Sequence, residues 1–198
     1  IADQDNFTAQ ASAIPGSNEE AIALQQKNQQ TEIFPLFLFA VAGMMLFPVA
    51  TDLITLFVAL EVFSLPLYLL AGLSRRKRLL SQEAALKYFL LGAYASAFFL
   101  FGAAFLYGYA GTISLVGISA AAGSANEVFL LIGIVFVSVG LLFKISAVPF
   151  HSWTPDVYQG APTPITAFMA ACTKVAAFGA ILRIFYIGFA EVETLWRP

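Results

Sequence analysis

Three ionisable residues, Glu61, Lys144 and Lys174, each lie within a long apolar stretch of this chain. A charged side chain at the centre of a lipid bilayer costs several kcal/mol, and such residues usually mark paths for ions or protons. The pattern therefore predicts transport chemistry. The structural alternative is a Glu that is permanently paired to join two helices, together with lysines whose ammonium groups reach the membrane surface.

Glu61 is expected near the membrane midplane, because it follows Asp52 by nine residues, or about 13 Å along a helix. Burial favours the neutral form of a carboxyl group, whereas a nearby cation favours its charged form. Burial also favours the neutral form of a lysine. We therefore expect Glu61 and Lys144 to form a pair that depends on protonation. When a proton reaches Glu61, Lys144 is expected to interact with Lys174 instead.

Lys87 and His151 are less specific candidates. Lys87 follows Glu83 by four residues, the spacing of an ordinary ion pair on a helix surface, and from the residues alone this interpretation is the stronger one. His151 follows Lys144 by seven residues and could relay protons, but a hydrogen-bonded loop residue is an equal alternative. No second His or acid is spaced for a metal site, and the sequence holds no phosphate-binding loop or nucleophile triad.

The composition indicates a membrane protein. Hydrophobic residues make up 60% of the 198 residues and charged residues 11%, and the mean hydropathy is +0.82. A soluble domain would carry roughly twice that share of charge. The single cysteine, Cys172, allows no disulfide or thiolate metal cluster within the chain. The chain opens without an initiator Met or a signal peptide, so we expect an internal piece of a larger membrane protein.

Five apolar stretches follow a polar segment, residues 1–32, that is expected to be an extramembrane loop with at most a short helix around residues 19–30. Each stretch is near the ~20 residues that a spanning helix needs. The predicted spans cover residues 33–50, 53–73, 82–109, 128–148 and 164–189. The first two are joined only by Thr51 and Asp52, which predicts an antiparallel hairpin. Residues 115–125 are expected to be a packed loop, and residues 191–198 the start of the next loop.

The fourth helix is predicted to break near Pro149. Four of the nine prolines fall between Pro149 and Pro164, and proline removes a backbone donor and clashes with the preceding turn. Broken helices at membrane depth are tolerated where they line a cavity or are buried in protein, and transporters use them at ion sites. We expect a broken extension to residue 163 and an all-α, polytopic transmembrane helix bundle.

The basic run from Arg75 to Arg78 predicts the orientation. It directly follows the second span, and the positive-inside rule places residues 74–78 in the cytoplasm. The N-terminal segment would then also be cytoplasmic, and residues 110–126 and the C-terminal end would face the opposite side. A topology signal is a better explanation of this run than nucleic-acid binding.

The stretch from Leu142 to Pro164 closely resembles the antiporter-like subunits of respiratory complex I, the proton-pumping NADH–quinone oxidoreductase. Ala59-Leu60-Glu61 and the stretch from Glu83 to Phe89 fit the same family in the right order, and the resemblance covers residues 33–190. The L and M types usually read PTPVSA with a His soon after. This chain has Pro-Thr-Pro-Ile-Thr-Ala at residues 162–167 and no His in that helix, so it is most similar to the N type.

The resemblance implies the fold and the partners. These subunits contain two inverted five-helix repeats, and the five spans would be one of them, with the second repeat of the same subunit missing. In the family, the Glu that matches Glu61 pairs with the Lys that matches Lys144. The Lys that matches Lys174 continues a polar axis, and the residues that match Lys87 and His151 belong to the same polar set. The implied function is proton translocation driven by electron transfer in other membrane subunits of a bacterial cell (inner) membrane. NAD, FMN, iron–sulfur clusters and quinone would be bound by those partner subunits, and none by this chain.

Two alternatives stay open. A cation/proton antiporter subunit shares the fold and the Glu–Lys pattern. A structural membrane scaffold would use the same residues as fixed ion pairs. The expected partners are the lipid bilayer and other membrane subunits, without nucleic acid.

Overall fold

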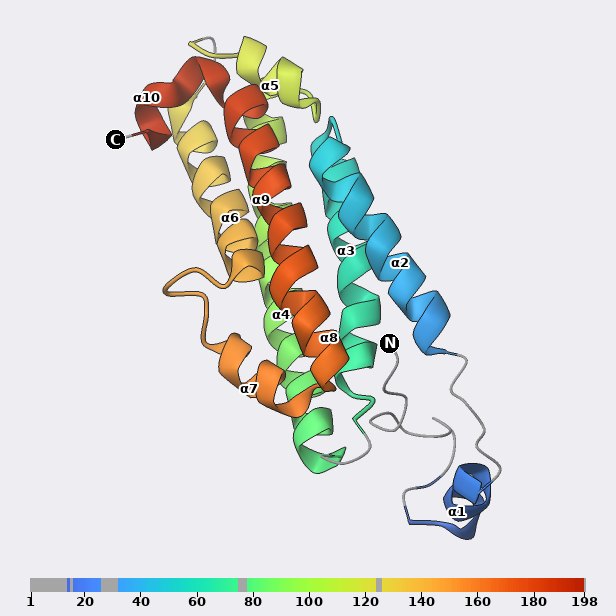
Figure 1. Ribbon diagram of the computed structural model, residues 1–198. Coiled ribbons are helices and arrows are strands. Elements are labelled where there is room, and N and C mark those ends of the chain that lie inside the picture. The colour runs from blue at the N-terminus through green and yellow to red at the C-terminus, as the bar shows by residue number, and fades with distance from the viewer. Residues whose placement is uncertain (1–13, 15, 26–31, 75–77, 124–125, 198) are drawn as a thin grey trace.

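The computed structural model describes residue 14 and residues 16–25, 32–74, 78–123 and 126–197, which form an elongated bundle of helices (Figure 1). The described part of the chain contains no β-strand, and the predicted all-α membrane class is confirmed. The α-helices are α1 Asn18–Gln25, α2 Ile33–Leu46, α3 Leu53–Ala71, α4 Arg78–Ala110, α5 Leu115–Ala120, α6 Glu127–Ile145, α7 Trp153–Gly160, α8 Thr163–Phe168, α9 Lys174–Arg183 and α10 Glu193–Trp196. Shorter turns are η2 Phe47–Val49, η3 Met169–Thr173, η4 Ile184–Gly188 and η5 Ala190–Val192.

Within the described ranges, four helices are long and apolar enough to cross a membrane, and a fifth apolar helix is shorter. The long ones are Leu53–Ala71, Arg78–Ala110, Glu127–Ile145 and Thr163–Gly188, and the shorter one is Ile33–Val49. The first span is therefore shorter than predicted from its apolar run. Pro48 lacks an amide hydrogen, so α2 ends at Leu46 and its last turn tightens into the 3₁₀ helix η2.

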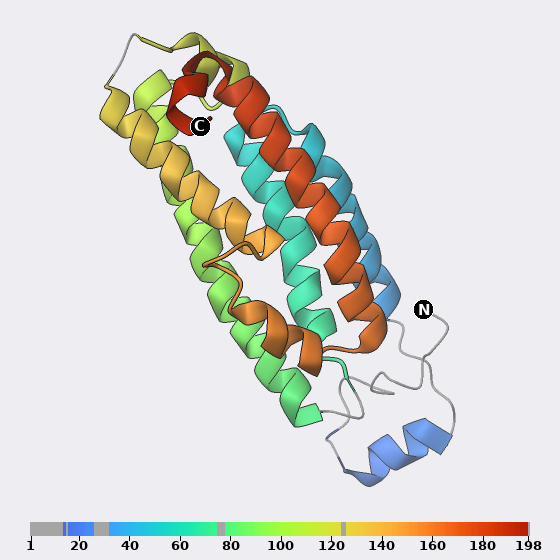
Figure 2. The same cartoon turned by 60° about the vertical axis from the view of Figure 1, so that its left-hand side comes forward.

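The helices pack as antiparallel neighbours at very close range. Helices α2 and α3 form the predicted hairpin, and α4 runs along α6 in both views (Figures 1 and 2). Glycine allows this approach: a Cβ added to Gly43 in α2 would lie 2.6 Å from the backbone nitrogen of Phe63 in α3. A Cβ added to Gly102 in α4 would lie equally close to the backbone nitrogen of Val137 in α6. Small residues of this kind are what helix packing in membranes requires.

The connection before α3 is held by hydrogen bonds at one end of the bundle. The Asp52 carboxylate caps α3 by accepting hydrogen bonds from the Thr55 amide at 2.8 Å and the Thr55 hydroxyl at 2.7 Å. The Leu53 amide donates to the Ile113 carbonyl, and the Leu115 amide to the Thr51 carbonyl, both at 3.0 Å. These bonds align the connection with the start of α5.

The expectation of an irregular loop over residues 115–125 was wrong, because residues 115–120 form helix α5. Leu115 and Ile118 are three residues apart, so a helix places both on one face, and both are buried. Leu115 packs against Gly188 in η4. The Gly-, Ala- and Ser-rich composition that suggested a loop hid this short apolar stripe.

Helix α6 breaks as predicted, but slightly earlier. It ends at Ile145 rather than at residue 148, and Ser146 adopts a left-handed conformation with φ of 59°. The Ala147 amide donates to the Leu142 carbonyl at 3.0 Å, which closes the helix end. The residue before a proline is biased away from helical geometry, so the chain turns before Pro149 and becomes helical again only in α7.

Other predictions concern the ends of the bundle. Helix α1 occupies the first part of the predicted residues 19–30, and residues 26–30 lie outside the described ranges, as do residues 75–77 of the basic run. Arg78 forms an ion pair with Glu20 at 2.8 Å, which joins α1 to the start of α4. The last span runs from residue 163 to 188 through two π turns.

Candidate functional site

Lys144 is enclosed near the end of α6, with only 3% of its surface exposed. Its Nζ donates hydrogen bonds to Ser64 Oγ at 2.7 Å and to Tyr68 Oη at 3.3 Å, both on α3. The rings of Phe63 and Tyr68 have their centroids 5.5 Å from Nζ, and the Phe143 ring is 5.9 Å away. Hydroxyl groups and aromatic faces therefore surround this ammonium group.

Glu61 lies on the same face of α3, because Ser64 and Tyr68 follow it by three and seven residues. It is half-buried, and its Oε1 atom is buried without a hydrogen-bond partner among the described residues. Glu61 and Lys144 do not form an ion pair in this structure, although Lys144 is within electrostatic range of the carboxylate. The expected direct contact is replaced by the two hydroxyl groups on α3.

The neighbourhood of Tyr68 is also tightly packed. A Cβ added to Gly92 in α4 would lie 2.1 Å from the Tyr68 hydroxyl oxygen, so glycine leaves the space that this hydroxyl occupies. On the other sides the Tyr68 ring makes edge contacts with Tyr88 at 4.6 Å and Phe89 at 5.7 Å between centroids. Helix α4 thus fixes the side chain that binds Lys144.

Lys174, the first residue of α9, lies at the break in α6. Its Nζ donates to the backbone carbonyl of Lys144 at 3.5 Å and to the hydroxyl of Ser146. It also lies 5.5 Å from the centroid of the Trp153 ring. A continuous helix would pair the Lys144 carbonyl with the amide of residue 148, so the break is what leaves this oxygen available. The structure thus brings the two lysines together around one carbonyl.

Lys87 lies apart from these two lysines. It forms the predicted ion pair with Glu83, at 2.7 Å, and a second one with Asp156 of α7, at 2.6 Å. The second pair links α4 to α7. His151 is exposed in the turn between α6 and α7, and its backbone carbonyl accepts a hydrogen bond from the Thr154 amide. The structure does not bring the His151 ring into the lysine cluster.

Sequence reasoning missed several residues of the site. Ser64 and Tyr68 share a helix face with Glu61, but nothing in the local pattern marked them as partners of Lys144. The other missed residues are Ser146, Trp153 and Asp156. The sequence held no signal for them, because only the folding of the chain brings them to the lysines or to the end of α6. Arg183, near the end of the last span, donates to the Ala50 carbonyl at 2.6 Å.

Metal binding has no support in the described residues, where no group of three His, Cys, Asp or Glu side chains comes together. The arrangement fits proton exchange better. Ser and Tyr hydroxyls can accept a hydrogen bond from an ammonium group and donate one to a neutral amine. The Ser64 hydroxyl already donates its proton to the Leu60 carbonyl, so the Tyr68 hydroxyl is the group that can satisfy both protonation states of Lys144.

Comparisons with known proteins identify the family of this chain. The family described as "NADH:quinone oxidoreductase/Mrp antiporter, TM" matches residues 50–196. The chain is 64% identical over 196 residues to the NADH-quinone oxidoreductase subunit N of Mycobacteroides abscessus, and the match covers 98% of this chain and 36% of the relative. The chain therefore spans little more than a third of the length of that relative.

Two solved structures share the fold. A chain of the respiratory complex I from Thermus thermophilus with bound aureothin is 46% identical with a TM-score of 0.70, and the match covers 78% of this chain and 34% of that one. A chain of the Mrp complex from Dietzia sp. DQ12-45-1b is 29% identical with a TM-score of 0.71, over 79% of this chain and 29% of that one. The predicted resemblance is confirmed, and the chain belongs to the NADH:quinone oxidoreductase/Mrp antiporter transmembrane family.

Proposed function

We propose that this chain takes part in proton translocation in a membrane subunit of an NADH–quinone oxidoreductase. The observation that carries the proposal is the buried Lys144 ammonium, which is bound by two hydroxyl groups, while the Oε1 atom of the nearby Glu61 carboxylate has no hydrogen-bond partner in the described part of the chain. Residues 33–190 would form one five-helix repeat of that subunit, and its second repeat would complete the path across the membrane.

The surroundings of Lys144 favour proton exchange over a fixed structural pair. A scaffold pair would place the carboxylate directly on the ammonium group, because each charge is costly alone in an apolar interior. Here hydroxyl oxygens contact Lys144 instead, and the Tyr68 hydroxyl can donate to Lys144 when its proton is lost.

The proposed step is a shift of charge along the membrane plane. A proton that reaches Glu61 removes the negative charge that favours the Lys144 ammonium. Lys174, whose Nζ contacts the backbone of Lys144, first passes its own proton on toward the second repeat and then takes up the proton that Lys144 releases. The charge would thus move from α3 through α6 to α9, with no redox step in this chain. Electron transfer, with NAD, FMN, iron–sulfur clusters and quinone, would occur in partner subunits.

Lys87 and Asp156 lie where α7 packs on α4, the helix that begins at Arg78 (Figure 1). In the proposed orientation, residues 74–78 face the cytoplasm of a bacterium and the helices span its inner membrane. The Lys87–Asp156 pair and His151 would then be part of the polar set on the cytoplasmic side, where protons are taken up.

A cation/proton antiporter subunit is the second candidate, because the Mrp complex of Dietzia shares the fold. The greater identity to complex I chains, 46% in the Thermus structure and 64% in the curated relative, favours the first. Sodium flux in vesicles that contain the intact complex would support the antiporter instead.

The test uses three variants of the intact complex in membrane vesicles: Lys144→Ala, Glu61→Gln and Lys144→Arg. The first two should strongly lower proton pumping and the coupled quinone reduction while the complex still assembles. Lys144→Arg should retain little proton pumping, because Arg stays protonated and cannot release its charge. Glu127→Gln, an exposed acid at the far end of α6, is the matched control. Normal pumping in Lys144→Ala and Glu61→Gln would leave only the structural scaffold.

A further inference from the structure

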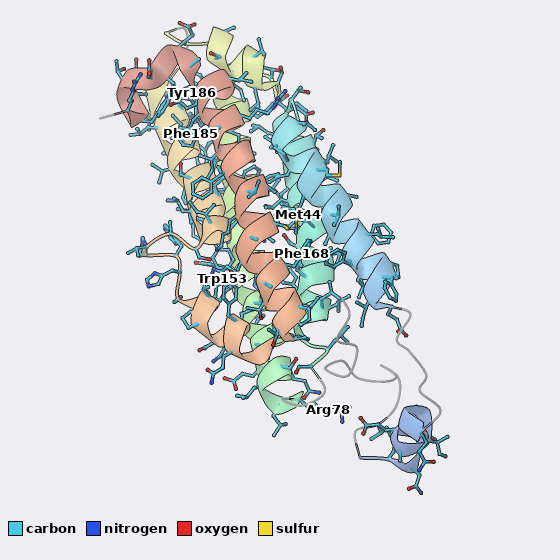
Figure 3. All side chains as sticks on the ribbon, in the orientation of Figure 1. Met44, Arg78, Trp153, Phe168, Phe185 and Tyr186 are labelled. Atoms are coloured by element: carbon cyan, nitrogen blue, oxygen red, sulfur yellow. The ribbon has the colours of Figure 1, made fainter. Side chains whose placement is uncertain are left out.

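Trp153 joins the two sides of the helix break. It is the first residue of α7, and only 3% of its surface is exposed. Its indole Nε1–H donates a hydrogen bond to the Phe143 carbonyl in the last turn of α6, at 3.1 Å. Figure 3 shows Trp153 between the end of α6 and α7. The indole therefore holds the end of α6 in place without any regular helical bond across the break.

The ring of Trp153 also connects the surroundings of the two lysines. It stacks on Tyr88 of α4 at 4.7 Å with an angle of 9°, and on Phe143 at 5.3 Å with an angle of 27°. Lys174 Nζ lies 5.5 Å from the Trp153 ring, and Lys144 Nζ lies 5.9 Å from the Phe143 ring. Each ammonium group thus contacts one ring of the same stacked pair.

No carboxylate forms an ion pair with Lys174 among the residues that the structure describes. Its charge is stabilised there by the Lys144 carbonyl, the Ser146 hydroxyl and the aromatic face. An ammonium group is attracted to the electron-rich face of an indole, and the attraction is strongest where water is excluded. Trp153 contributes to two of these three features, because its hydrogen bond to Phe143 also holds the turn that presents the Lys144 carbonyl.

We propose that Trp153 is a positioning residue that stabilises the charged form of Lys174 and holds the acceptor carbonyl of Lys144 toward it. This inference rests on the proposed function. When Trp153 is removed, Lys174 loses part of what stabilises its charge, so the shift of charge from Lys144 becomes less favourable. Electron transfer in other subunits would continue, with fewer protons moved for each NADH oxidised.

The first experiment compares Trp153→Leu, Trp153→Phe and Trp196→Leu in the intact complex, with protons pumped per NADH as the readout. Loss of the contact between the part-buried Lys174 and the ring should lower this ratio by roughly twofold or more in Trp153→Leu. Trp153→Phe keeps a ring but loses the N–H group, so its ratio should lie between those of Trp153→Leu and the unmodified protein. Trp196 donates to the Phe189 carbonyl at the opposite end of the bundle, so Trp196→Leu should pump normally.

A second experiment separates the electrostatic role from packing. Fluorinated tryptophans keep the shape and the N–H group of the indole but withdraw electrons from its face. Growth on mono- and difluorinated tryptophan should lower the pumping ratio stepwise in the unmodified complex and leave it constant in the Trp153→Phe complex. This comparison decides the question even where Trp153→Leu fails to assemble. An equal response in both backgrounds overturns the proposal.

Lys144→Ala, measured in parallel, separates this inference from the proposed function. Normal pumping in Trp153→Leu with lost pumping in Lys144→Ala would refute the role of Trp153 alone. Normal pumping in Lys144→Ala would refute the proposed function, and with it the reason for a positioning residue at Trp153.

Discussion

Gly92→Ala should lower proton pumping even though it changes no charge and no hydrogen-bonding side chain. The new methyl group would lie 2.1 Å from the Tyr68 hydroxyl oxygen, and Cβ atoms essentially never approach a heavy atom closer than 3.0 Å. The hydroxyl or the helices must therefore shift by at least 0.9 Å (3.0 Å minus 2.1 Å). The Tyr68–Lys144 hydrogen bond is already 3.3 Å long, so a shift of this size away from Lys144 breaks it.

The expected size of the effect follows from that bond. A hydrogen bond to a charged group contributes about 1.5–3 kcal/mol. Each ~1.4 kcal/mol is about tenfold in a rate, so pumping should fall by roughly tenfold or more if the bond acts in the translocating state. Tyr68 is enclosed by Tyr88 and Phe89, which leaves its ring little room to escape without losing contact with Lys144.

The assay is proton uptake in vesicles that contain the intact complex, with the amount of assembled complex measured beside it. Gly108→Ala is the matched control, because it is the same substitution on the same helix and its methyl group would lie 3.4 Å from the Phe129 ring, an ordinary contact. Gly108→Ala should pump normally. Normal pumping in a fully assembled Gly92→Ala complex would show that the Tyr68 bond to Lys144 plays no part.

Two further predictions concern the helix cap and the absence of a redox centre. Asp52→Ala should destabilise α3 by about 1 kcal/mol at neutral pH. Partial burial raises the pKa of Asp52, but hydrogen bonds from Thr55 lower it more, to a value below the usual 3.8. Because the folded-state pKa of Asp52 is lowered, the cap stabilises fully at pH values above the usual pKa, and this stabilisation is lost as the pH falls through the lowered pKa. The thermal unfolding temperatures of Asp52→Ala and the unmodified chain should therefore converge in acid. A difference that stays constant with pH would contradict the cap. The purified chain should also show no stoichiometric absorbance from flavin, haem or an iron–sulfur cluster, since it has one cysteine and one histidine.

The positions of the charged residues and of the helix break were predictable because both are costly in a membrane. A lone Glu61 or Lys144 in an apolar run contrasts sharply with its neighbours. Prolines within a long apolar stretch likewise indicate a break, and the structure differs only by ending α6 at Ile145. The two-residue connection at residues 51–52 allowed little besides a hairpin.

The partners of these residues were not predictable, because they are neutral and distant in sequence. Ser64 and Tyr68 are 80 and 76 residues away from Lys144. Hydroxyl side chains are common in membrane helices, so nothing in the local pattern distinguishes these two. Their contact with Lys144 depends on how α3 and α6 are aligned, and glycines such as Gly92 decide how near the helices come. Asp156 was similarly overlooked, since only the packing of α7 on α4 brings it to Lys87.

The break in α6 and the buried lysines stabilise each other. A buried carbonyl without a partner costs about 1–3 kcal/mol, and a buried ammonium group without acceptors costs more. When α6 ends at Ile145, the Phe143 carbonyl accepts from Trp153 as well as from the Ser146 amide, and the Lys144 carbonyl is left to accept from Lys174. A regular helix would use both oxygens internally and leave Lys174 with fewer acceptors. The prolines after residue 148 therefore do more than end a helix: they create the acceptors that allow a second lysine to lie within the membrane beside the first.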